Sequence, residues 1–138
     1  MNAVTIYPII VAAISTFIIS SLWYSQLLFG RHWAKLVGLD DQTLDETRMS
    51  AVWKSYAAQL IASIVLFSVL GFIFVTTGMR GAVNGATLGA LAWLGFIATD
   101  TVGKILWEKL PIKLACINAG ISLFNLALGG AIIGSWGN

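Results

Sequence analysis

The sequence predicts an all-α fold, a polytopic membrane bundle of four transmembrane helices, and three observations lead to this prediction. Of the 138 residues, 58% are hydrophobic and only 10% are charged, whereas an ordinary soluble domain is about 25% charged. The mean hydropathy is +0.86. Long apolar runs recur four times along the chain. Because a hydrocarbon core about 30 Å thick needs roughly 20 helical residues, we expect four crossings in a single transmembrane domain over residues 1–138.

The first predicted helix covers about residues 4–29, which contain no charged side chain. We expect it to be retained, since no small-residue cleavage signal follows a short apolar core. The long polar segment Gly30–Ser50 comes next and places Trp33 on one side, with Arg31 and Lys35 on the other. Such a segment is typical of a short amphipathic stretch on a membrane surface, so these three residues are candidates for contact with lipid at the cytoplasmic interface.

The other three helices are predicted at about residues 52–77, 81–107 and 111–136. The second carries Lys54 near its start and is otherwise uncharged. The fourth begins at Pro111, a residue that suits the first turn of a helix because its missing N–H has no intrahelical acceptor there.

The positions of the basic residues predict the orientation of the bundle. Seven of the eight Lys and Arg residues lie in or beside two connections, between the first and second helices and between the third and fourth. They are Arg31, Lys35, Arg48, Lys54, Lys104, Lys109 and Lys113. The opposite side has Arg80 alone. Because short cytoplasmic loops are enriched in Lys and Arg, we expect both basic loops in the cytoplasm and both termini outside, in the inner (plasma) membrane of the cell.

Glycine recurs on one face of the third helix and on one face of the fourth. Gly81, Gly85 and Gly89 are four residues apart, and so are Gly130 and Gly134. Glycines at this spacing let two helix backbones approach closely in lipid, where dispersion and weak contacts drive association. Each face packs either against a neighbouring helix of the same chain or against another copy. A homo-oligomer is expected, because one bundle of this size offers little room for a pathway.

Asp100 is the first candidate for a functional site. If the third helix covers about residues 81–107, Asp100 lies seven residues, about 10 Å, to the cytoplasmic side of its midpoint near Trp93. A charged carboxylate buried there costs on the order of a few kcal/mol unless it is paired or protonated, and Lys104 lies one turn later as a partner. In the competing interpretation the helix leaves the hydrocarbon near Thr99, and the two residues form an exposed pair among the headgroups.

Other polar side chains are expected at the depth of Asp100, because buried amides in lipid need partners. These candidates are Tyr24, Gln59, Asn118 and Asn125. We predict that they form a polar cluster in the cytoplasmic half of the bundle. The cluster is either a structural network that fixes helix register or the lining of a site for a small solute or ion, with Asp100 as the titrating or cation-binding group.

Patterns typical of enzymes, metal proteins and nucleic-acid-binding proteins are missing from the sequence. His32 is the only histidine and Cys116 the only cysteine, so one chain cannot assemble a metal site from such ligands. His32, Ser21 and Ser25 lack the third member and the sharp turn of a hydrolase. Glycine-rich phosphate loops are absent, and the basic residues are too few for nucleic acid. We therefore expect no enzyme activity, no cofactor, no metal and no nucleic-acid partner.

Two stretches carry a recognisable pattern: LWYSQLLFGRHWAKLVGL and LAWLGFIATDTVGKILWEKLPIKLACINAGISL. In them the chain resembles the small bacterial membrane proteins grouped as domain-of-unknown-function family 1761. The matching residues are Trp23, Tyr24, Ser25, Phe29, Gly30, Trp33, Gly95, Phe96, Thr99, Asn118 and Gly120. Gln26 stands where the family's pattern leads us to expect proline, so the helix is free to continue. The resemblance extends over nearly the whole chain and implies a four-helix membrane protein, but no activity.

Two functions remain for a small membrane protein of this kind. The first is binding or passage of a small solute or ion through the polar cluster of an oligomeric bundle. The alternative is a structural or accessory protein that binds lipid or a partner protein through Arg31, Trp33, Lys35 and the glycine faces, without transport. The surroundings of the Asp100 carboxylate distinguish the two.

Overall fold

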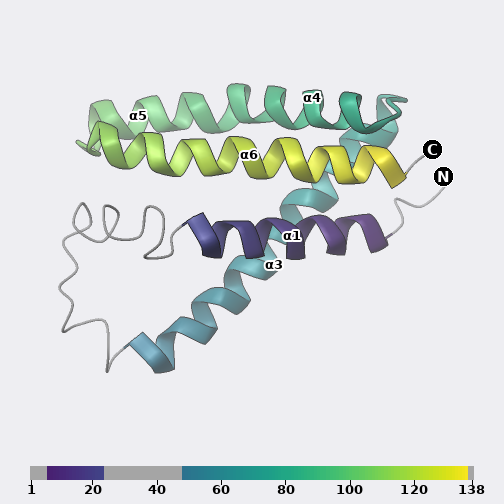
Figure 1. Cartoon of the computed structure of the whole chain (residues 1–138). Coiled ribbons are helices and arrows are strands. Elements are labelled where there is room, and N and C mark those ends of the chain that lie inside the picture. The colour runs from purple at the N-terminus through teal and green to yellow at the C-terminus, as the bar shows by residue number, and fades with distance from the viewer. Residues whose placement is uncertain (1–5, 24–47, 137–138) are drawn as a thin grey trace.

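The computed structural model describes residues 6–23 and 48–136, and these residues are helical apart from short connections (Figure 1). The elements are α1 (Ile6–Trp23), α3 (Arg48–Thr76), α4 (Ala82–Ala92), the π-helical segment η1 (Trp93–Ala98), α5 (Thr99–Trp107) and α6 (Ile112–Trp136). This part of the chain contains four helical segments that are each long and apolar enough to cross a membrane. They are α1, α3, α6 and the continuous rod formed by α4, η1 and α5. The predicted all-α, multi-pass architecture is confirmed.

The helix boundaries follow local backbone chemistry. The turn between α3 and α4 contains Gly78 and Gly81, with φ of 71° and 89°, values that glycine adopts without the steric cost of a Cβ. Lys109, two residues after the end of α5, has a φ of 58°. Helix α6 begins at Ile112, one residue later than expected, and the carbonyl of Pro111 accepts its first hydrogen bond, from the Ala115 N–H at 2.9 Å. The predicted residues 24–29 and most of the amphipathic segment lie outside the described residues.

The helices form a three-helix layer crossed by a fourth (Figure 1). The rod of α4, η1 and α5 lies antiparallel to α6, and α1 packs against α6 as well. Helix α3 crosses at an angle and contacts α1, α6 and α4. The start of α1 and the end of α6 lie at one end of the bundle, and the connection between α5 and α6 lies at the other.

The core is centred on α3 where it crosses α1 and α6. Its buried apolar residues are Ile9, Ala12, Ala13, Phe67, Leu70, Phe74, Leu126 and Ile133. The Phe67 ring occupies the space beside Gly129, since a Cβ there would overlap the ring atoms. In lipid such contacts are favoured by close packing rather than by removal of apolar surface from water. Small residues of α1 and α6 therefore determine where α3 docks.

The closest helix contact is between α4 and α6. A Cβ added to Gly85 would overlap the carbonyl oxygen of Gly130, and a Cβ on Gly134 would overlap that of Gly81. Gly89 lies in the same way against the carbonyl of Leu126. The glycine faces of the two helices thus lie against each other within one chain, and a second copy has no access to them.

The two helices contact each other less closely after Trp93. This residue follows Gly89 by one turn, and its indole Nε1 donates to the carbonyl of Ala119 on α6 at 2.9 Å. The Trp93 indole lies between the backbones of the two helices, which approach closely at the glycines before it. The π-helical segment begins at the same residue. Helix α5 consequently packs against α6 far less than α4 does.

Candidate functional site

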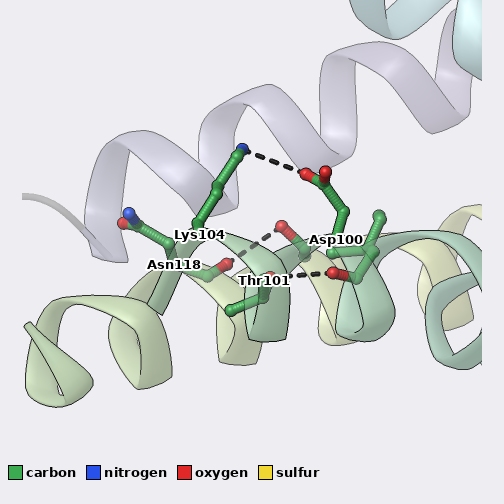
Figure 2. Close-up of polar contacts among 6 residues, drawn as sticks. Asp100, Thr101, Lys104 and Asn118 are labelled. Atoms are coloured by element: carbon green, nitrogen blue, oxygen red, sulfur yellow. Dashed lines mark hydrogen bonds and ion pairs between the residues drawn. The ribbon is translucent and has the colours of Figure 1, made fainter. Parts of the chain in front are cut away.

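Asp100 lies on an exposed side of α5. Its side chain is 65% exposed and pairs with Lys104, whose Nζ is 3.1 Å from Oδ2 and whose side chain is 49% exposed (Figure 2). The predicted pairing one turn apart is therefore present. With 65% of its surface exposed, the Asp100 side chain is not enclosed by the other described helices.

Asn118 lies half-buried on α6, and Figure 2 shows its amide pointing away from the Asp100–Lys104 pair. The backbone carbonyl of Asn118 accepts a hydrogen bond from Ser122 Oγ at 2.9 Å. Thr101, the residue next to Asp100, is half-buried, and its hydroxyl donates to the carbonyl of Ile97 at 2.8 Å. Thr101 thus takes the inward-facing position on α5 that was expected for Asp100.

Asn125 makes the one side-chain to side-chain hydrogen bond between different helices within the described segments. Its Nδ2 donates to Ser20 Oγ on α1 at 2.7 Å. Its Oδ1 is buried and receives no hydrogen bond from the described residues. An acceptor left in this state costs about 1–3 kcal/mol. Exchanging the amide nitrogen and oxygen would only transfer the deficit to the NH₂ group, so an unmatched polar atom remains in either orientation.

Other polar residues of α1 and α6 lie near the Asn125 amide, on the side toward the α5–α6 connection. Asn125 lies one residue from the midpoint of α6, near the centre of that span. Toward the α5–α6 connection, Asn118 and Ser122 lie on the same face of α6 by their spacing. We call Ser20, Asn118, Ser122 and Asn125 the α1–α6 polar seam. At its end Trp23 Nε1 donates to the carbonyl of Ile117 at 3.2 Å.

Among the remaining candidates, only Gln59 belongs to the described residues. Gln59 is exposed on α3, and its backbone carbonyl accepts a hydrogen bond from Ser63 at 2.9 Å. The other predicted residues, Tyr24, Arg31, Trp33 and Lys35, lie outside the described residues. The structure thus brings Asn118 and Asn125 to one helix interface and leaves Asp100 and Gln59 on exposed surfaces.

Ser20, the partner of Asn125, is not among the site residues predicted from the sequence. A signal for it exists, because Ala12, Thr16 and Ser20 are spaced by four residues and share one face of α1. Thr16 on this face is only 2% exposed, and its hydroxyl donates to the carbonyl of Ala12 at 2.8 Å. A face of small and hydroxyl-bearing residues indicates close packing against a neighbouring helix in lipid.

The described residues contain no group of three or more His, Cys, Asp or Glu side chains placed to hold a metal ion. The chemistry on offer is therefore that of amides and hydroxyls between α1 and α6. The oxygen atoms of such groups bind hydrogen-bond donors or monovalent cations.

Comparison with known proteins gives one match. A model of the family described as protein of unknown function (DUF1761) matches residues 7–134, which include most of each of the four spans. No curated protein and no solved structure matches the chain.

Proposed function

The chain belongs to the family of proteins of unknown function DUF1761, and from its own residues we propose that it binds a small solute or cation at the α1–α6 polar seam. The observation that carries this proposal is the buried Oδ1 of Asn125 near the middle of a span, an acceptor to which no described residue donates a hydrogen bond. Polar groups at such depth are costly, and where they persist they commonly mark a binding site. The proposal involves no catalytic step.

The chemistry of the seam narrows the class of ligand. An unmatched amide oxygen needs an N–H or O–H donor or a cation, and the Ser20 hydroxyl beside it can supply a second oxygen. None of the four seam residues is a carboxylate. Divalent cations are usually held by carboxylates, so the seam suits a neutral hydrogen-bonding solute or a monovalent cation.

The expected orientation places the polar end of the seam toward the cytoplasm. Lys104, Lys109 and Lys113 lie at the end of the bundle where α5 joins α6, and Arg80 lies in the α3–α4 turn. With basic loops in the cytoplasm, both termini are outside and the seam is in the cytoplasmic half of the inner membrane. A solute would then reach Asn125 from the cytoplasm.

The test is binding and uptake with purified protein in proteoliposomes. The probes are Na⁺, K⁺ and a panel of small neutral amides and polyols. We expect the parent to bind or take up one of them above the level of empty vesicles, and Asn125→Leu to reduce this signal at least tenfold. Ser20→Ala should weaken it less, because it removes only the neighbouring hydroxyl.

The matched control is Asn84→Leu. Asn84 is exposed on α4, and its amide donates to the carbonyl of Arg80 at 2.7 Å. This variant loses the same amide without touching the seam, so it should behave like the parent. The proposal fails if the parent gives no signal with any probe, or if the two variants lose it equally.

A second candidate function, that of an accessory protein binding lipid or a partner, is favoured by one specific observation. The Asp100–Lys104 pair faces outward rather than into the bundle, and α3 also exposes large apolar side chains such as Ile61, Val65 and Phe72. Failure of every probe in the uptake experiment, together with recovery of a defined partner from the membrane, would favour this function.

A further inference from the structure

One face of η1 and α5 combines charge, glycine and aromatic rings, and none of the other described helices covers it. Its residues follow helical spacing: Phe96, Thr99, Asp100, Gly103, Lys104 and Trp107. Phe96 is 73% exposed and Trp107 is 86% exposed. A Cβ added to Gly103 would meet no atom within 4 Å. We call this set the α5 outer face.

Lipid alone is a poor neighbour for this face. Asp100 lies seven residues, about 10 Å, before the last residue of α5, so its carboxylate is inside the span. A lysine facing lipid normally extends its ammonium group toward the headgroups. Lys104 instead reaches back one turn to Asp100, toward the middle of the span. Two charged groups exposed to hydrocarbon at this depth are costly unless another surface covers them.

We propose that a second copy of the chain covers the α5 outer face, in a parallel dimer with two-fold symmetry. In such a dimer the same patch meets itself, so it must be self-complementary. The patch carries one acid and one base four residues apart, about 6 Å along the helix axis. A two-fold axis between them places Asp100 of each copy beside Lys104 of the other, within reach of a lysine side chain.

The other residues of the α5 outer face also suit contact with a second copy of the chain. Gly103 lies along the helix between Asp100 and Lys104, where the absence of a side chain lets a second backbone approach. Phe96 and Trp107 supply apolar contact at the two ends. The glycine faces of α4 and α6 cannot serve, because they pack against each other within the chain. The proposal is independent of the solute site, since no residue of the polar seam belongs to this face.

A charge-swap experiment tests the contact between copies. Asp100→Lys gives a face with two cations, and Lys104→Asp gives a face with two carboxylates. Energy transfer between differently labelled copies, measured in liposomes over a range of protein-to-lipid ratios, reports the dimer. We expect each variant alone to raise the dimer dissociation constant about three- to thirty-fold, the range of polar contacts between membrane helices. Mixing the two variants should restore dimers, because opposite charges then meet across the interface.

The control for total charge is Lys113→Asp, an equal change at an exposed residue at the start of α6, which should leave the dimer unchanged. Helix content by circular dichroism verifies that each variant is folded. The proposal is overturned if the parent is monomeric at every ratio, or if mixing gives no more energy transfer than either variant alone.

Cross-linking gives a second, milder test. In a cysteine-free background, Gly103→Cys should form disulfide-linked dimers in the membrane on mild oxidation. Val83→Cys, on α4 and at a residue that is 79% exposed, should not, although this position is the more accessible of the two. Equal cross-linking at both positions would indicate random collision and contradict the proposed interface.

Discussion

Substitution of Gly85 by alanine tests the close contact between α4 and α6. The new Cβ would overlap the carbonyl oxygen of Gly130, lie 2.7 Å from its carbonyl carbon and lie 3.2 Å from the Cα of Gly134. All three atoms belong to backbone, so no side chain can rotate away. Since carbon atoms pack best at about 3.5–4.0 Å, the helices must separate by at least about 0.8 Å to relieve the contact with the carbonyl carbon, and by more to relieve the closer overlap with the oxygen.

The separation determines the expected loss of stability. A gap of 0.5–1 Å already removes a quarter to a half of the dispersion energy of each contact it opens. Overpacking of a close contact costs about 1–3 kcal/mol, and a backbone obstacle puts Gly85→Ala near the upper value. Because alanine has a higher helix propensity than glycine, the substitution also stabilises the helix by about 1 kcal/mol. We expect a net loss of about 2 kcal/mol, or roughly a thirty-fold change in the unfolding equilibrium constant.

The assay is denaturant unfolding in mixed detergent micelles, followed by tryptophan fluorescence because Trp93 lies between the two helices. The matched control is Gly120→Ala on α6, where the new Cβ would lie 3.8 Å from the Trp23 ring, an ordinary contact. This variant should be as stable as the parent or more stable by up to about 1 kcal/mol. Equal stability of Gly85→Ala and Gly120→Ala would refute the backbone-to-backbone contact.

Three further predictions follow from the same structure. Trp93→Phe removes the indole hydrogen bond to Ala119 and should cost about 1 kcal/mol in the same unfolding titration; an unchanged midpoint would contradict it. Gly81→Ala forces a Cβ onto a residue with φ of 89° and should lower stability by about 1–2 kcal/mol in that titration, whereas an unaffected protein would argue against this turn geometry. The orientation is tested with single cysteines in a cysteine-free background. A cysteine at Thr77 should react with an impermeant maleimide added outside, whereas one at Lys109 should react only after permeabilisation. The reverse pattern would show that the bundle has the opposite orientation.

The four spans were predictable because a bilayer imposes a length and a composition on any helix that crosses it. The glycine spacing also predicted close helix contacts, but it did not reveal their partner. A sequence signal for the partner exists in the numbering. Gly81 and Gly134 lie equally far from the boundary between Trp107 and Glu108, where α5 ends, and so do Gly85 and Gly130. Antiparallel helices joined by a short turn bring such residues to the same height, which favours contact within the chain.

The polar cluster was only partly predictable, because the sequence indicates how far along its helix each polar residue lies but not the direction in which its side chain points. In an uninterrupted α-helix, Asp100 lies eleven residues after Gly89, close to three full turns, and would face α6 as Gly89 does. The π-helical segment from Trp93 to Ala98 winds more slowly. It rotates α5 by about a quarter turn relative to α4, so that Thr101 faces inward and Asp100 faces outward. A sequence pattern that assumes 3.6 residues per turn cannot detect this change.

The packing of the other half of the bundle determines what the seam can do with a bound solute. Beyond Asn125, toward the termini, the bundle is closed by an apolar core that includes Ala12 and Ala13 of α1, both fully buried, and Ile133 of α6. A solute at Asn125 therefore meets a closed apolar contact, and this conformation supports binding rather than passage. Passage requires one helix to move. Helix α4 is the less suitable one, because its backbone interlocks with that of α6 at successive glycines. Among the described residues, α1 is joined to α6 by few hydrogen bonds, so any opening at the end of the bundle that holds the termini should separate α1 from α6.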